Sequence, residues 1–177
     1  NELKSNFNIE VYEYDNDKLN SVFIDSNIFV LASFDTSTLG QSCLDFLERV
    51  RYKEFQGFTS SLVLSEVIHR FMVKEAQDNT GYSSRETVKY LQMHPEYVRT
   101  LKRHLRAASI VRTFGVDILP LTVKDLHTSK IVRADHGLLA NDSLIVGVMR
   151  NNKLYHLATH DAGFLRVAQL QVWMPTV

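Results

Sequence analysis

The chain has 177 residues, of which 45% are apolar, so it can bury one sizeable hydrophobic core. Lys and Arg together number 20, as do Asp and Glu, which gives no sign of a strongly basic nucleic-acid binder or an acidic tail. No stretch approaches the roughly 18 consecutive apolar residues of a membrane span, and residues 1–10 lack the pattern of a signal peptide. We expect one domain in a reducing cytoplasm, with the single Cys43 acting as a small buried hydrophobe.

The beginning of the chain differs in character from the rest. Residues 1–20 are polar and contain Phe7, Ile9 and Val11 in the alternation of an edge strand. The regular pattern starts only at Ser21. We therefore predict an N-terminal extension over residues 1–20 and one domain over residues 21–177.

Apolar runs and helical periodicities alternate along this domain. Short apolar runs predict strands at residues 21–24, 57–60, 117–121, 153–159 and 169–174. The first strand is expected to close in the polar turn Asp25-Ser26-Asn27. Apolar residues at helical spacing predict helices at residues 39–51, after a cap at Ser60 or Ser61, at 122–134 and at 141–150. Strands that alternate with helices indicate βαβ units, so we predict an α/β fold, a three-layer α/β/α sandwich with a mostly parallel sheet of about five strands.

The segment between residues 78 and 114 is longer than these units require. Asp78 to Gly81 is expected to form a turn, Ser83-x-x-Glu86 resembles a capping box, and Pro95 interrupts the helix that this box opens. A single helix is predicted from Pro95 to about Phe114, ended by Gly115.

Two faces of this last helix are of interest. Its apolar residues Val98, Leu101 and Leu105 are assigned to the core, with a dimer seam as the alternative. Its basic residues are spaced three, four and seven apart, which places them on one side, where they could contact an RNA backbone: Arg99, Lys102, Arg103 and Arg106. A solvated helix face explains the same pattern equally well.

Four acidic residues are expected at the carboxyl edge of the sheet, where ligands bind in open α/β folds. Asp25 directly follows the first strand, Asp161 lies two residues after Thr159 at the end of the fourth, and Asp142 begins a helix. Glu66 lies about one and a half turns into the helix after the second strand, from which its side chain could reach the same edge. Carboxylates gathered in one cleft need a cation, and hard oxygen ligands favour Mg²⁺ or Mn²⁺. Metal-assisted phosphodiester hydrolysis is the reaction class that such a centre supports.

Each acid also has an ordinary structural explanation. Asp25 could cap the following segment, Asp142 could interact with a helix dipole, and Asp161 could belong to a simple turn. Glu66 is spaced i, i+4 from Arg70, which is typical of a surface ion pair. The functional interpretation is favoured, because under the structural explanations four unrelated acids would have to lie at the same sheet edge by coincidence.

Four segments of the sequence resemble the signature segments of PIN domains, in the same order along the chain: SVFIDSNIFV, SSLVLSEVIHRF, LLANDSLIVGVMRNN and LYHLATHDAGFL. The resemblance spans about residues 21 to 177. It implies a Mg²⁺- or Mn²⁺-dependent ribonuclease in which Asp25, Glu66, Asp142 and Asp161 match the acidic metal-binding positions. Thr159 then matches a supporting hydroxyl residue, and Asn27 a polar residue that commonly follows the first aspartate.

The chain is also similar to the VapC-like toxin halves of toxin–antitoxin pairs, which implies RNA as substrate and a small antitoxin as partner. A homodimer is considered as well, because the apolar stripe of the last helix could form a dimer seam. It differs from that group in its leading 20 residues, in the long segment from Asp78 to Pro95 and in His160. A lone histidine has no visible chelating partner, so we expect His160 to be exposed or hydrogen-bonded.

Other α/β proteins fit the sequence less well. Phosphatases that form an aspartyl-phosphate need a second aspartate where this chain has Asn27, and receiver domains need one after the third strand, where it has Leu119 to Thr122. The stronger alternative is a PIN-like module that binds RNA or protein without catalysis.

Overall fold

The computed structural model describes residues 7–8 and 21–176. Within these residues, six strands form one sheet in the order β1-β6-β5-β2-β3-β4. Neighbours from β6 to β4 pair in parallel, and β1 pairs antiparallel with β6 at one edge. The strands are β1 Phe7–Asn8, β2 Ser21–Ile24, β3 Gln56–Ser60, β4 Asp117–Leu119, β5 His156–Ala158 and β6 Gln171–Pro175.

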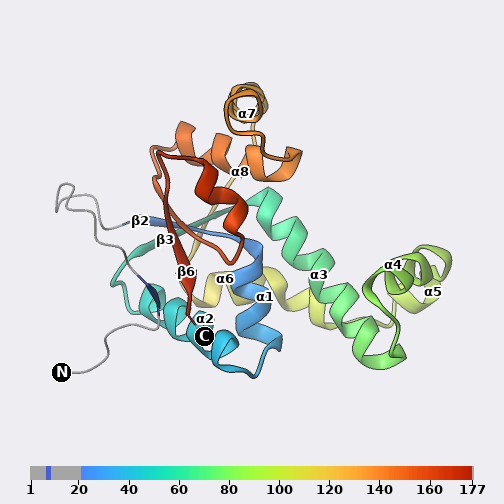
Figure 1. The fold of residues 1–177 in the computed structure, drawn as a ribbon. Helices are drawn as coiled ribbons and strands as arrows, with labels where there is room; N and C mark the ends of the chain where they lie inside the picture. Colours follow the sequence, from blue (N-terminus) through green and yellow to red (C-terminus); the bar gives the residue numbers. More distant parts are fainter. Residues whose placement is uncertain (1–6, 9–20, 177) are drawn as a thin grey trace.

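Helices cover both faces of this sheet. In Figure 1, α7 and α8 lie on one side and α1, α2 and α6 on the other, while α3 leads away from the sheet to α4 and α5. The α-helices are α1 Ser26–Phe34, α2 Thr38–Arg51, α3 Ser61–Thr80, α4 Ser84–Met93, α5 Pro95–Val98, α6 Ala107–Thr113, α7 Val123–His136 and α8 Ala140–Asn151. The short 3₁₀ helices are η1 Arg103–Arg106 and η2 Ala162–Arg166. This arrangement confirms the predicted three-layer α/β fold with a parallel sheet of five strands.

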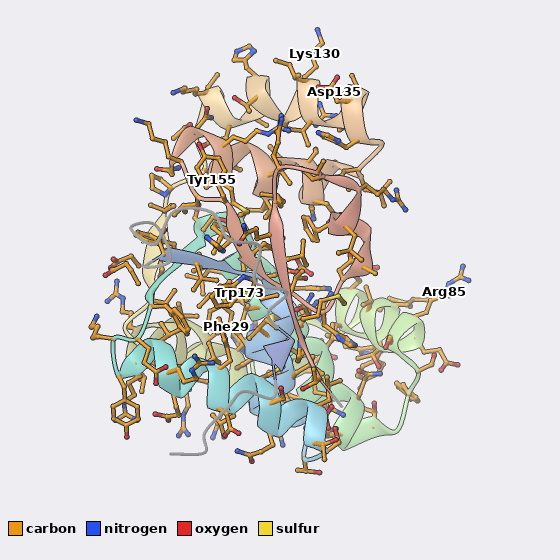
Figure 2. All side chains as sticks on the ribbon, turned by 60° about the vertical axis from the view of Figure 1, so that its left-hand side comes forward. Phe29, Arg85, Lys130, Asp135, Tyr155 and Trp173 are labelled. Atoms are coloured by element: carbon orange, nitrogen blue, oxygen red, sulfur yellow. The ribbon has the colours of Figure 1, made fainter. Side chains whose placement is uncertain are left out.

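The core lies between the sheet and the helices that cover it. Phe29 of α1 and Trp173 of β6 are almost fully buried, and Figure 2 shows both in the middle of the molecule. By contrast, Lys130 and Asp135 project outward from α7 in the same view. Cys43 is free and buried, as expected of a small hydrophobe. Among the described residues, no helix is long and apolar enough to cross a membrane.

The junctions between strands and helices place polar side chains at the carboxyl edge of the sheet. Asp25 ends the β2 ladder, because its N–H donates to the carbonyl of Ala158 over 3.0 Å, and it also caps α1. Ser60 caps α3 with its hydroxyl group, one of the two caps predicted from the sequence. Neighbouring strands of this sheet therefore deliver the start of α1, the start of α3 and the residues after β5 to one edge.

Two local predictions are wrong. The residues after Asp25 do not form a polar turn, because α1 begins at Ser26 without any intervening loop. Asp78 to Thr80 are not a turn either, since α3 continues to Thr80 and is ended by Gly81 in the left-handed conformation. The capping box of Ser83 and Glu86 is confirmed at the start of α4.

The single helix predicted from Pro95 to Phe114 is also wrong. The segment consists of α5, η1 and α6, separated after Val98 by a turn. The carboxylate of Glu75 in α3 accepts hydrogen bonds from the backbone N–H groups of Lys102, at 3.0 Å, and Arg103, at 2.8 Å. These bonds satisfy donors that a continuous helix would pair with its own preceding carbonyls.

The break changes which apolar residues are buried. Leu101 is buried as predicted, but Leu105 is 71% exposed and is not part of the core. Of the edge-strand alternation predicted near the N-terminus, Ile9 and Val11 lie outside the described residues, whereas Phe7 falls in β1.

Candidate functional site

Asp25 is the most deeply held of the predicted site residues. The residue is 5% exposed, and its carboxylate accepts three hydrogen bonds: from the N–H of Ser26 at 2.6 Å, from Nδ2 of Asn27 at 2.7 Å and from the hydroxyl of Thr159 at 2.7 Å. These donors come from two different parts of the chain. The carboxylate is therefore fixed in one orientation at the end of β2.

Thr159 is the connecting residue of this network. Besides donating to Asp25, its fully buried hydroxyl oxygen accepts from Nδ2 of Asn27 at 3.0 Å and from the N–H of Asp161 at 3.1 Å. Asn27 in turn accepts from the N–H of His160 at 2.9 Å. Both supporting residues predicted from the sequence thus contact Asp25 directly. His160 is exposed, and its backbone is hydrogen-bonded, which confirms the expectation for this residue.

The other three acids approach from α3, α8 and η2. Glu66 of α3 forms an ion pair with Arg70 at 2.9 Å, the i, i+4 pair that its spacing indicates. Asp161 caps η2 and accepts from the N–H of Gly163 at 2.7 Å. Asp142 lies in the first turn of α8 and accepts no hydrogen bond from any described residue.

Burial and neighbouring negative charges raise the pKa of two of these acids, Asp25 and Asp142. Burial raises the pKa of the Asp25 carboxyl group, and the negative charge of Glu66 raises it further. Hydrogen bonds from Thr159 and Ser26 and the positive charge of Arg70 oppose this rise in the Asp25 pKa.

Asp142 responds in the same way. Partial burial raises its pKa, the charges of Asp161 and Glu66 add to the rise, and Arg166 opposes it. Glu66 thus interacts with both Asp25 and Asp142, and Asp142 with Asp161. We call these four residues the acidic cluster.

Asp25, Glu66 and Asp161 are engaged with protein partners, whereas Asp142 has no hydrogen-bond partner among the described residues. Within residues 7–8 and 21–176, no group of three His, Cys, Asp or Glu side chains is positioned to hold a metal ion. The donor chemistry nevertheless fits a hard divalent cation, because the acidic cluster offers only carboxylate oxygens, with the polar groups of Asn27 and Thr159 beside them.

Two arginines near the acids are absent from the site predicted from the sequence. Arg70 was identifiable from its spacing to Glu66, although its influence on Asp25 was not. Arg166 gave no signal, because its effect on Asp142 depends on η2 and α8 meeting in space. Its Nη1 donates to the carbonyl of Gly137 at 3.3 Å, between α7 and α8.

The predicted basic helix face does not exist as such. Arg99 follows α5, Lys102 is the N-cap residue of η1, and Arg103 and Arg106 lie at the two ends of η1. Arg103 forms an ion pair with Asp78 at 2.7 Å and stands over the ring of Phe34. All four basic side chains are exposed, but they do not share one side of a continuous helix.

The fold and the acidic cluster define a class: a parallel α/β domain with carboxylates gathered at the carboxyl edge of its sheet. The family model described as the PIN domain matches residues 22–170. The chain belongs to the PIN domain family, which confirms the resemblance found in its four sequence segments.

Individual proteins are also similar to the chain. Ribonuclease VapC2 of Methanocaldococcus jannaschii is 26% identical over 155 residues, which cover 86% of this chain and 93% of that protein. Among solved structures, VapC20 of Mycobacterium tuberculosis, described as a sarcin–ricin loop cleaving toxin, superposes with a TM-score of 0.55 at 15% identity, covering 86% of this chain and 98% of that one. A chain in the FitAcB structure from Neisseria gonorrhoeae gives 0.52 at 18% identity, covering 85% and 95%. At such identities the two structures bear on the fold alone.

Proposed function

We propose that this chain is an endoribonuclease that hydrolyses RNA phosphodiester bonds with Mg²⁺ or Mn²⁺ held by the acidic cluster. The observation that carries the proposal is the placement of Asp25 at the end of β2, Asp142 in the first turn of α8 and Asp161 after β5, where the charge of Glu66 adds to the rise in the pKa of both Asp25 and Asp142. Such a concentration of negative charge is stabilised by a bound cation. The ribonuclease named among its relatives supports RNA as the substrate.

The residues of the site have separable roles in this proposal. Asp25 is oriented by three donors and supplies a fixed ligand, with Thr159 and Asn27 as positioning residues. Asp142, which has no hydrogen-bond partner in the described chain, supplies a ligand free to bind. A divalent ion held by these carboxylates would offset their charge and that of the scissile phosphate, and would supply an activated water for in-line attack. Arg166 places a positive charge beside Asp142, where a phosphate of the substrate would approach.

An RNA cleavage assay on the purified chain tests this proposal. Cleavage is expected with Mg²⁺ or Mn²⁺, is expected to stop with EDTA, and is expected to fall by roughly 100-fold or more in Asp25→Asn, the scale of a positioned catalytic group. Folding of the variant is checked by circular dichroism. An unchanged rate in folded Asp25→Asn would overturn the proposal.

A second function is favoured by a different observation. Because no three acidic or histidine side chains of the described residues are placed to hold an ion, the chain could be a PIN-like module that binds RNA or protein without cleaving RNA. That function predicts RNA binding with the same affinity in Mg²⁺ and in EDTA, and no cleavage in either.

We further propose that the chain is the toxin of a toxin–antitoxin pair. Support comes from the similar structures, which include a toxin–antitoxin complex from Klebsiella pneumoniae with a TM-score of 0.52 at 15% identity. Induced expression of the chain is then expected to arrest bacterial growth, and Asp25→Asn is expected to relieve the arrest. Growth that continues under expression of the active ribonuclease would contradict the toxin role alone. The homodimer and the cytoplasmic location stay predictions, as do the RNA contacts of Arg99, Lys102, Arg103 and Arg106.

A further inference from the structure

Arg70 connects the acidic cluster to the exposed surface of α3. Its Nε lies 2.9 Å from Oε1 of Glu66, one helical turn earlier. Its positive charge also acts on Asp25, the buried acid at the end of β2. The guanidinium group therefore interacts with two members of the acidic cluster.

Glu66 is the only ion-pair partner of Arg70 among the described residues. The side chain of Arg70 is 45% exposed. Glu66 is 28% exposed, which leaves its carboxylate accessible to an ion from solvent. The Glu66 carboxylate is therefore available to two cations: Arg70, which is already beside it, and a divalent ion bound by the acidic cluster.

The ion pair holds the Glu66 carboxylate against a partner on its own helix, one turn away. Exposed pairs of this kind are weak, so a divalent ion can displace the arginine. The pair would lower the affinity for the ion without preventing its binding.

We propose that Arg70 is an internal counter-ion of the acidic cluster and competes with the divalent cation for Glu66. This inference rests on the metal site of the proposed function and adds a positioning residue to it. In the metal-free protein, Arg70 neutralises Glu66. A bound divalent ion would take over Glu66 as a ligand, and Arg70 would then lose its carboxylate partner.

The test is a titration of Mn²⁺ into the metal-free full chain, with free Mn²⁺ measured by electron paramagnetic resonance. Arg70→Gln removes the competitor and is expected to tighten Mn²⁺ binding roughly two- to fivefold, as the weakness of exposed ion pairs allows. Arg70→Lys keeps the charge and is expected to bind Mn²⁺ with an affinity near that of the wild type. Thermal unfolding confirms that each variant is folded.

Two controls separate competition from a general change of charge. Arg85 lies on α4, is exposed and projects outward from the molecule in Figure 2, so Arg85→Gln removes the same charge away from the acidic cluster and is expected to leave Mn²⁺ affinity unchanged. In a Glu66→Gln background, Arg70→Gln is expected to lose most of its effect, because the shared carboxylate is gone.

The outcomes distinguish this inference from the proposed function. Mn²⁺ binding that depends on Asp25 but is unchanged or weakened in folded Arg70→Gln would overturn the competition and leave the metal site standing. Failure of the wild-type protein to bind Mn²⁺, or binding that is unaffected by Asp25→Asn, would overturn both.

Discussion

At the scale of single residues, the hydroxyl group of Thr159 joins three parts of the candidate site. It donates to Asp25 and accepts from Asn27 and from the backbone of Asp161. Because the group is fully buried, water cannot replace these bonds when they are lost. Its role is to hold ligands in place without binding an ion itself.

Thr159→Val, which keeps the shape of the side chain and removes the hydroxyl group, tests this role. We expect RNA cleavage to fall roughly 10- to 100-fold, as on loss of residues that orient metal ligands. We expect the free energy of unfolding to fall by about 1–3 kcal/mol, because a buried carboxylate loses a donor. Thr159→Ser, the matched control, should retain most of both. Equal activity of the valine and serine variants would show that the hydroxyl group does not position the site.

For Asp142 we predict the opposite effect on stability from that of Thr159→Val. Its pKa is raised by burial and by Asp161 and Glu66, so its ionised form is destabilising in the metal-free protein. Asp142→Asn should therefore leave the free energy of unfolding unchanged or higher at pH 7 while abolishing Mn²⁺-dependent cleavage. Denaturant unfolding measured without metal checks the first part. A variant that unfolds would show that the principal role of Asp142 is to stabilise the start of α8.

His156 supplies the clearest pH dependence outside the site. Burial lowers its pKa below the ordinary 6.5, and its Nδ1 is buried without a hydrogen-bond partner among the described residues. A base with a lowered pKa stabilises the fold above pH 6.5, and this contribution is lost as the pH falls below 6.5, because the unfolded chain gains the proton first.

The wild-type protein should accordingly lose more stability than His156→Gln between about pH 7 and pH 5. Chemical unfolding across this range measures the difference. His69→Gln, which alters an exposed histidine of α3, should keep the wild-type pH dependence. Parallel stability curves for the wild type and His156→Gln would contradict the assignment.

At the scale of secondary-structure elements, the sequence predicted the parallel strands well because each is a short buried run. It did not predict α1, since Ile28 and Phe29 are both fully buried and the helix starts directly at the end of β2. A helix enclosed in this way lacks the polar face by which amphipathic helices are recognised. The amphipathic pattern is thus missing from α1 because the helix is buried on several sides.

The break between α5 and α6 was unpredictable for another reason. It depends on Glu75, which lies 27 residues before Lys102 and contacts it only in the folded chain. No periodicity within the segment reports such a tertiary contact. The prediction of a basic helix face was wrong for the same reason, because it assumed one continuous helix.

Glu75→Gln tests whether this carboxylate holds η1 against α3. The variant keeps the size of the side chain but weakens its bonds to the backbone N–H groups of Lys102 and Arg103, so we expect unfolding to become easier by about 1–2 kcal/mol. Glu48→Gln, in an exposed pair with Arg51, should cost less than about 0.5 kcal/mol. Equal costs in the two variants, measured by denaturant unfolding, would argue against the anchoring role of Glu75.

At the scale of the whole molecule, equal numbers of acidic and basic residues conceal an uneven distribution. The acidic cluster lies at one edge of the sheet, and Arg70 and Arg166 act on it from α3 and η2. From residue types and positions, the four acids were predicted to meet at this edge, and the PIN resemblance added Asn27 and Thr159. The service of the four acids as a metal site stays a prediction. The partners of those side chains could not be predicted, because they depend on which helices meet at that edge.

The most direct test of the acidic cluster as a metal site is an anomalous difference map from crystals of the wild-type chain soaked in Mn²⁺. We predict a peak between Asp25, Asp142 and Asp161, with Glu66 turned from Arg70 toward the ion or toward a water that contacts it. Absence of a peak at this edge of the sheet, in crystals that bind Mn²⁺ elsewhere or not at all, would contradict the hydrolytic function derived from the cluster.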